Sequence, residues 1–474
     1  MFIDTLPTRV HASVVWKGAV LFAFLFIFTQ QTFAQRQSDL TGSPQTTSGP
    51  ALRLQDLEQM ALQNNPTLPQ AEAAIRAAEG RRRQAGLLPN PVIGYTGEEF
   101  AFRSFGDKSE HLFFIEQTIP LGGKLSKSRN IFAQEKVQAE FEAAAQKQRV
   151  LNAVRMLYYE ALGAQQLVEV RSQLAKLARD AAGVTGELFN VGQADRPDML
   201  EIEVEAERAQ LDLVMAENAR DQVWQQLAAL VGNPYLKPTQ LVGNLEGGLP
   251  VLNQEAVLAK MLAESPEIKR AQAGIERARA SLLRARAEPK PDLFVRGGFG
   301  YNREFLETEA TTTRRRTGPE AQVEIGIRIP LFNRNQGGIA SSNAERDIAE
   351  RERQRVELSL RARLASSFRI YQNALRAAEQ YERQIIPRAQ RAYELYLTRF
   401  RQMAASYPQV LISQRTLFQV RAEYVRALVD AWQTATQIQG YMLNGGLEAP
   451  MGIGVESGSS SDTSLQSAQD EDRR

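Results

Sequence analysis

Apolar and polar side chains alternate strictly between residues 321 and 329. The apolar positions are Ala321, Val323, Ile325, Ile327 and Ile329, and the polar positions are Gln322, Glu324, Gly326 and Arg328. A period of two predicts a strand with one apolar and one polar face. Residues 293–301 alternate in the same way and predict its hairpin partner, with a polar loop at residues 303–318 between them. A less regular hairpin, rich in Tyr and Phe, is predicted over residues 92–118 with its turn at residues 104–109.

Four stretches predict helices longer than those of an ordinary globular protein. Residues 124–188 contain no proline, and a helix of ~65 residues would be ~100 Å long. Residues 197–231 predict its antiparallel partner, and residues 338–400 and 408–443 repeat this arrangement. Heptad spacing is visible at Leu417, Val420, Tyr424, Leu428, Ala431, Ala435, Ile438 and Met442. Each half is therefore expected to be a long helical hairpin that packs against other chains.

The two halves of the chain are copies of one unit. Pro66, Pro89 and Pro91 recur 200 positions later as Pro266, Pro289 and Pro291. The motif Ile119-Pro120-Leu121 recurs as Ile329-Pro330-Leu331, 210 positions later. Each copy contains a short helix, a helix stopped by Pro-x-Pro, a β-hairpin and a long helical hairpin, so the duplication sets the architecture.

The strand pattern alone allows a soluble hairpin packed on helices. Strands of about 10 alternating residues with a long polar loop on one side are also typical of a transmembrane β-barrel. A signal-like segment at residues 1–34, which predicts export, and the absence of any later apolar run favour the transmembrane interpretation. Because four strands cannot close a barrel and open edges are not tolerated in lipid, several chains would have to share one.

The ends of the chain predict targeting and linker segments. Residues 1–34 resemble a signal peptide, with an apolar run at residues 18–28 and small residues before a cleavage site; an uncleaved anchor is the alternative. Residues 35–51 and 447–474 are expected to be a disordered linker and tail. The first repeat is then predicted at residues 52–245, with strands at about 91–119 and long helices at about 122–232. The second is predicted at residues 246–446, with strands at about 291–330 and long helices at about 333–443.

Composition narrows the range of functions. The formal net charge of +2 and the absence of a basic stripe argue against a nucleic-acid partner. Three consecutive arginines occur at residues 81–83 and again at residues 314–316. We interpret the first group as a solvated helix face and the second as part of a loop, rather than as nucleic-acid contacts. The chain has no cysteine, so disulfides and thiolate metal sites are excluded. The mature chain has a single histidine, His111, expected at a loop edge, and we predict no catalytic residue, cofactor or metal cage.

The chain resembles the outer-membrane efflux proteins typified by TolC over residues 52–445. The resemblance rests on the duplicated proline units, the Ile-Pro-Leu strand ends and the tip motif Phe189-Asn190-Val191-Gly192 followed by Asp198-Met199-Leu200. The first tip and the acidic residues after it are most similar to the heavy-metal branch typified by CzcC. The implied fold is mainly α, with helical hairpins in a trimeric periplasmic α-barrel and four strands from each chain in one twelve-stranded β-barrel. The implied partners are two further copies, outer-membrane lipid, a periplasmic membrane-fusion adaptor and an inner-membrane pump of the resistance-nodulation-division type.

The resemblance also implies a periplasmic mouth narrowed by polar and acidic residues after the tips. Asp198 occupies such a position, with Asp195 and Glu201 nearby, while the second tip has Gln409 where some relatives carry acids. Three copies of one acid would favour cations. The alternative is that these acids stabilise a helix start through the dipole. The other acids of the tract, at positions 203, 205 and 207, do not share one helix face and are expected to be mostly solvated.

On the strands, Gln322, Glu324 and Arg328 would face the lumen if the apolar set faces lipid. The sequence therefore predicts an outer-membrane exit duct without enzymatic activity, for divalent heavy-metal cations. Two alternatives stay open: a duct for drugs or type I protein secretion, and a periplasmic coiled-coil scaffold without a pore.

Overall fold

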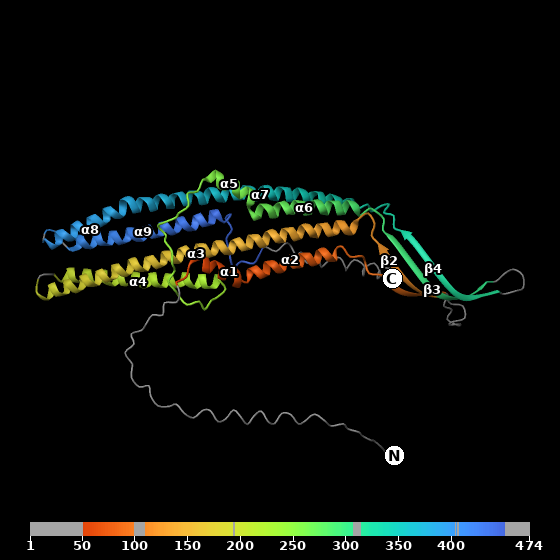
Figure 1. Cartoon of the computed structure of the whole chain (residues 1–474), viewed down its shortest axis with the longest axis horizontal. Helices are drawn as coiled ribbons and strands as arrows, with labels where there is room; N and C mark the ends of the chain where they lie inside the picture. The colour runs from red at the N-terminus through yellow and green to blue at the C-terminus, as the bar shows by residue number, and fades with distance from the viewer. Residues whose placement is uncertain are drawn as a thin grey trace, which may run out of the picture. The chain divides into compact units, whose positions relative to one another are not determined.

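The computed structural model describes residues 51–98, 110–192, 195–306, 314–402, 404 and 407–450. Their helices lie side by side along one direction, and a single sheet extends from one end of them (Figure 1). No helix in these ranges is long and apolar enough to cross a membrane. The predicted signal peptide, most of the linker, most of the tail and the turn at residues 104–109 lie outside the described residues.

The first repeat begins with two short helices, α1 (Leu54–Asn64) and α2 (Thr67–Gln84). Strands β1 (Val92–Glu98) and β2 (Glu110–Ile119) follow. The long hairpin consists of α3 (Lys124–Asn190) and α4 (Arg196–Leu230), with Pro197 in the first turn of α4, where its missing N–H costs no hydrogen bond. Gly232 ends the repeat with φ +75°, and a side chain there would collide with the Asn64 carbonyl at the end of α1.

The second repeat has the same order. Helix α5 (Gln254–Glu264) is capped by Asn253, whose side chain accepts a hydrogen bond from the Ala256 N–H at 3.0 Å. Helix α6 (Pro266–Ala287) leads to β3 (Leu293–Leu306) and β4 (Arg314–Ile327). The strands thus extend into residues 303–318, which had been expected to be a loop, and residues 314–316 belong to β4. The prediction was wrong because backbone pairing such as that of Leu306 with Arg314 does not require apolar side chains.

The first long helix of the second repeat is interrupted, whereas the prediction for residues 338–400 was one continuous helix. Helix α7 (Gln336–Gln380) passes through a π-helical turn at Tyr381–Ile385 into α8 (Ile386–Arg401). Pro387 lies in the first turn of α8 and has no N–H to donate to the preceding turn, which explains the break. Helix α9 (Tyr407–Gln439) returns along α8 and α7.

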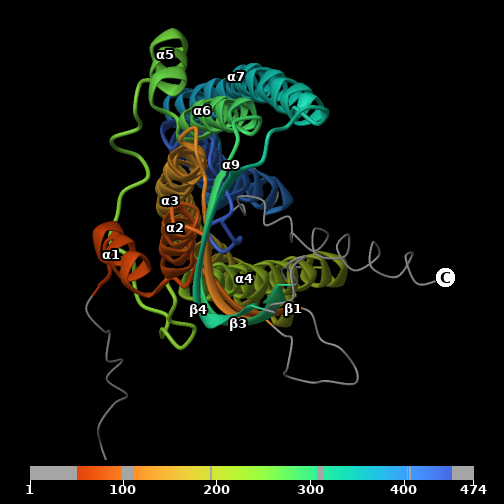
Figure 2. The same ribbon diagram turned by 90° about the vertical axis from the view of Figure 1, so that its right-hand side faces the viewer.

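The helices next to the sheet follow one another in the order α2, α3, α6 and α7, as the view along the bundle shows (Figure 2). Toward the opposite end, α3 packs on α4 and α9, and α9 packs on α8. Three apolar clusters hold these contacts. The largest is centred on α3, α4 and α9 and includes Val150, Trp224 and Leu227; a second joins α7 to α5 and α9. A third lies between α3 and α4 and contains Leu174 and Leu213.

Long side chains fasten the segment between the repeats onto these helices. The Trp224 indole donates to the Leu236 carbonyl at 2.8 Å, the Tyr158 hydroxyl to Val242 at 2.6 Å and the Trp432 indole to Leu245 at 2.9 Å. Each donor keeps an apolar body in the core and satisfies a backbone carbonyl with its polar end. The segment at residues 233–253 is therefore an ordered part of the helical body.

Candidate functional site

The strands of the described residues form one antiparallel sheet in the order β1-β2-β3-β4, and the outer edges of β1 and β4 pair with no other described strand. The pairing aligns Ile93, Ile115, Gly297 and Val323 in one row, and Tyr95, Phe113, Phe299 and Ala321 in the next. This face is apolar and exposed: Ile93 is 78%, Phe113 67% and Val323 74% exposed. Apolar side chains exposed over adjacent rows of a sheet face indicate a partner other than water.

The opposite face of the sheet carries charge. Glu116, Arg296 and Glu324 align in one row, and Gln322 follows on the same face. Arg296 does not pair with either neighbouring carboxylate: its Nη2 donates to the Thr96 hydroxyl at 3.0 Å, and its guanidinium lies 3.6 Å from the centroid of the Phe114 ring. Of the predicted pore-lining residues, Gln322 and Glu324 thus share the polar face, and Arg328 follows the end of β4. Glu116 was missed because the first hairpin alternates less regularly. Arg296 occupies a polar position of the regular alternation at residues 293–301, so that pattern could have identified it.

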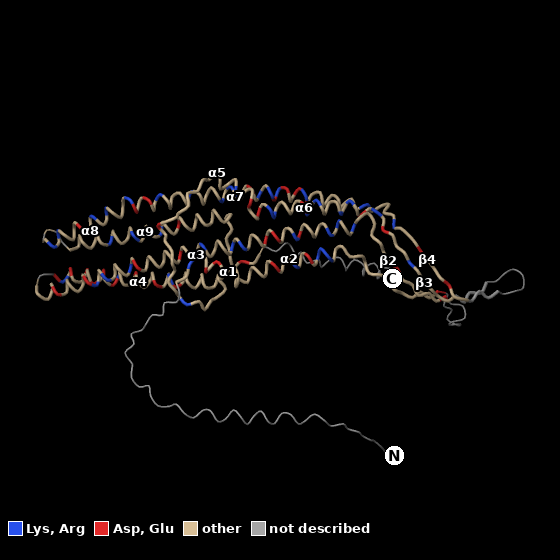
Figure 3. The backbone as a smooth tube through the Cα atoms, in the orientation of Figure 1, with Lys and Arg blue, Asp and Glu red and all other residues tan. Residues whose placement is uncertain are grey.

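The turns between the long helices lie at the end of the helical body away from the sheet, and acidic and basic residues are distributed along the long helices (Figure 3). Asp195 is the residue before α4, and its side chain makes no capping hydrogen bond; its backbone carbonyl accepts from the Met199 N–H at 3.2 Å. Asp198 lies in the first turn of α4. Asp195, Asp198, Glu201 and Gln409 are all exposed. The structure places the four gate candidates at one end of the hairpins without bonding them to one another.

Glu205, one turn further along α4, behaves differently from its acidic neighbours. Arg415 of α9 donates to it through both Nε and Nη2, with the Nε–Oε1 distance 2.9 Å. The Glu205 side chain is only 15% exposed. The hydrogen bond with Glu205 raises the pKa of Arg415 against the effect of burial, and the charges of Glu205 and Glu201 add to this. This pair connects the first helical hairpin to the second and borders a cavity of about 380 Å³ lined by α3, α4 and α9.

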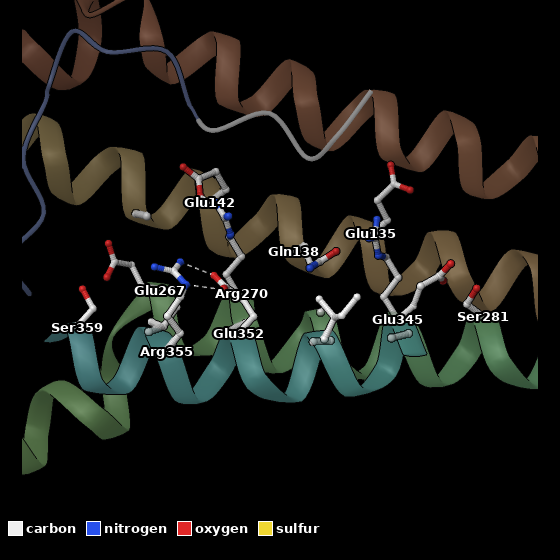
Figure 4. A pocket seen from close by; sticks show the side chains of 18 of the residues that line it. Glu135, Gln138, Glu142, Glu267, Arg270, Ser281, Glu345, Glu352, Arg355 and Ser359 are labelled. Atoms are coloured by element: carbon white, nitrogen blue, oxygen red, sulfur yellow. Dashed lines mark hydrogen bonds and ion pairs between the residues drawn. The ribbon is translucent and has the colours of Figure 1, made fainter. Parts of the chain in front are cut away.

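A larger cavity of about 760 Å³ lies between α3, α6 and α7. Figure 4 shows charged side chains from all three helices around it. Glu142 of α3 accepts from Arg149 at 2.8 Å and from Arg270 of α6 at 2.7 Å. Burial would raise the pKa of Glu142, but the two arginines outweigh it and lower the pKa below its ordinary value. The cavity thus contains an ion-paired polar network that joins the two repeats.

The network continues from Arg149 to the C-terminal segment. Arg149 donates to the Gln146 amide at 2.9 Å, and Gln146 donates to the Thr67 hydroxyl at 2.9 Å and to the Glu448 carbonyl at 3.1 Å. Hydrogen bonds of the helical body therefore reach Glu448. The side chains of Glu142, Gln146 and Arg149 all bond to protein partners, which indicates a structural role for the network. In the lining of the same cavity, Gln138 Oε1 and Arg363 Nε are buried without a hydrogen-bond partner among the described residues.

Among the described residues, no three His, Cys, Asp or Glu side chains gather in a way that could hold a metal ion. His111 lies in β2 rather than at a loop edge, and its Nδ1 is 2.5 Å from the Tyr95 hydroxyl. Its ring is thus held within an aromatic group on the sheet.

Comparisons with known proteins agree with this architecture. The sequence profile described as outer membrane efflux protein matches residues 57–233 and 257–442. The cobalt-zinc-cadmium resistance protein CzcC of Cupriavidus metallidurans is 28% identical over 418 residues, which cover 87% of this chain and 96% of that protein. The pyoverdine export outer membrane protein OpmQ of Pseudomonas putida is 23% identical over 425 residues, 84% and 86% of the two chains. The solved structure of the outer-membrane channel OprN superposes with a TM-score of 0.69 at 15% identity, covering 83% of this chain and 91% of that one.

Proposed function

Because the chain belongs to the outer membrane efflux protein family, whose members are transport proteins, we propose that it is the passive exit duct of a tripartite system that exports divalent heavy-metal cations. It is a channel protein of the outer membrane, with its helical part in the periplasm. Our proposal concerns the substrate of this channel, its assembly and its partners. Family membership leaves the alternative of a pore-free periplasmic scaffold without support.

One observation carries the proposed assembly. The sheet has an exposed apolar face, and its two outer edges pair with no other strand in the described part of the chain. In hydrocarbon every backbone N–H and C=O must find a partner within protein. Four strands are too few to close on themselves. Three copies joined edge to edge would form a twelve-stranded barrel, with lipid against the apolar face and Glu116, Arg296 and Glu324 toward the lumen.

The helical hairpins would continue this barrel through the periplasm, with the tips toward an adaptor protein and a pump of the resistance-nodulation-division type. The pair Arg415–Glu205 would then hold neighbouring hairpins together near the mouth. Asp198 and Glu201 are exposed in the same region. Three copies of these carboxylates would raise the local concentration of cations, which supports a cationic cargo.

The similarity to a cobalt-zinc-cadmium resistance protein over most of both chains supports metal ions as the cargo. Similarity to a pyoverdine export protein supports a duct for organic molecules as the second candidate. Tolerance of a deletion strain to zinc, cobalt, nickel, copper and a set of lipophilic toxicants separates the two. We expect metal tolerance to fall and to return with the natural gene; loss of tolerance to the organic compounds alone would overturn the metal assignment.

A further inference from the structure

Two exposed apolar clusters flank the open edges of the sheet, both at its helix end. The β1-edge cluster consists of Leu87, Leu88 and Val92, each more than half exposed. The β4-edge cluster consists of Ile329, Leu331 and Phe332, and Phe332 is 91% exposed. Large apolar side chains gathered beside unpaired strands indicate a surface that another molecule covers.

The duplication supplies an internal example of such a junction. The segment after β2 lies against the segment before β3, so a side chain at Gly122 would collide with Lys290. The Leu121 N–H donates to Asp292 Oδ1 at 3.1 Å, and Lys124 Nζ is 2.9 Å from the same oxygen and 4.0 Å from Glu288. Within the chain, therefore, one repeat meets the next through a polar contact.

The open edges carry the equivalent positions with different chemistry. Offsets of 210 and 200 residues relate Gly122 to Phe332, Glu288 to Leu88 and Asp292 to Val92. The glycine and both acids of the internal contact are thus replaced together by apolar residues, while its two lysines, Lys290 and Lys124, correspond to Asn90 and Arg334. Such coordinated replacement fits two surfaces that meet each other, since a phenylalanine against Glu288 and Asp292 would leave carboxylates beside apolar surface.

We propose that the β4-edge cluster of one copy packs into the β1-edge cluster of the next copy, with Phe332 as the central aromatic anchor. This inference rests on the proposed trimer and adds to it a specific contact. In a ring of identical chains each contact is made by two different surfaces, so both clusters are used once per interface. Buried aromatic side chains at the centre of an interface carry much of its binding energy.

A lipid covering is the other occupant to consider. Phe332 and Leu331 border a cavity of about 750 Å³ that is also lined by Glu116, Arg296 and Glu324 of the polar sheet face. A side chain beside that charged face is poorly placed to enter hydrocarbon, which favours protein as the covering surface.

Disulfide formation tests the contact, because the natural chain has no cysteine. The variant L88C/F332C, purified as the full chain and oxidised, is expected to migrate as a covalent trimer that reductant returns to the monomer, since a disulfide needs Cα atoms within about 7 Å. The two single variants and the pair Y235C/F332C serve as controls. Tyr235 lies between α4 and α5, is 91% exposed, and is far in sequence from both sheet edges.

The outcomes separate the contact from the proposed function. If the L88C/F332C protein is trimeric by mass and conducts in a bilayer but stays uncrosslinked, the contact is wrong and the duct stands. A protein that neither trimerises nor conducts overturns both. A bimane label on F332C in brominated lipid provides a second measurement: strong quenching would show that lipid covers position 332 and would overturn the contact, whereas absence of quenching supports it.

Discussion

Arg415 on α9 and Glu205 on α4 form an ion pair between the two helical hairpins of the chain. The residues lie 210 positions apart, the same offset that relates Leu121 to Leu331. They therefore occupy corresponding heights on the second helix of each hairpin. A contact there restrains the hairpins relative to each other close to the tips.

Replacing Glu205 by Gln is expected to loosen this end of the helical body. The Arg415 side chain is 54% exposed, and a pair screened by solvent in this way contributes only about 0.2–1 kcal/mol. We therefore predict little change in thermal stability but a severalfold higher single-channel conductance. The charge-reversed pair E205R/R415E should return toward natural conductance. As a control, E352Q removes an ion pair contained within α7; equal conductance of E205Q and E352Q would contradict a restraining role for Glu205.

Asp198 is expected to favour cations at the mouth. The variant D198N removes three charges from a trimer, and we predict a reversal potential in a salt gradient shifted toward lower cation selectivity. Neutralising Asp195, the residue before α4, should change selectivity less, because Asp198 occupies the position that the family resemblance associates with the mouth and Asp195 lies beside it. Identical reversal potentials for D198N and the natural protein would refute the assignment.

The buried carboxylate of Glu142 should make stability depend on pH. Its pKa is lowered in the folded chain, so the carboxylate stabilises the fold above the unfolded-state pKa of about 4.3, and this contribution disappears as the pH falls through the lower folded-state pKa. We expect E142Q to be less stable at pH 7 by about 3 kcal/mol, because Arg149 loses its charged partner. Thermal unfolding followed by circular dichroism should show this difference shrinking as the pH is lowered below about 4. A difference that is independent of pH would contradict the linkage.

Asn152 should stabilise the turn after α9. Its fully buried amide donates to the Gly440 carbonyl at 2.8 Å and to the Leu443 carbonyl at 2.9 Å. In between, Tyr441 and Met442 hold positive φ angles of 59° and 60°, a conformation that is strained for residues other than glycine. We expect N152A to lower the free energy of unfolding by about 2 kcal/mol. Gln148 donates to Asn152 at 2.9 Å, and Q148A should lower the free energy of unfolding by less than N152A does. Equal losses of stability in the two variants would argue against a specific role for the two carbonyl contacts.

The parts of the fold with a long regular pattern could be predicted from sequence. The alternation from Ala321 to Ile329 indicated β4 and its apolar face, and the heptad from Leu417 to Met442 lies largely in the buried side of α9. The break at Pro387 was missed because the surrounding residues favour helix on both sides. The extension of β3 and β4 into polar sequence was missed because backbone pairing leaves no periodic signal in such residues.

The candidate site was predicted less completely. The exposed acids at the tip could be named from the motif that precedes them, but the different role of Glu205 could not be inferred from local spacing. Its partner lies on the other repeat, and a spacing of two along a helix suggested solvent for the whole acidic tract. The repeat offset of 210 was the available signal, since it relates Glu205 to Arg415. Contacts of this kind depend on how the hairpins are placed, which no single segment encodes.

Planar-bilayer recording of the purified natural chain tests the central claim most directly. With a zinc salt gradient across the membrane and no energy source, a passive duct should give stepwise conductance with a reversal potential on the cation-selective side. A trimeric protein that inserts into the bilayer and passes no current, or that passes anions in preference to zinc, would contradict the account.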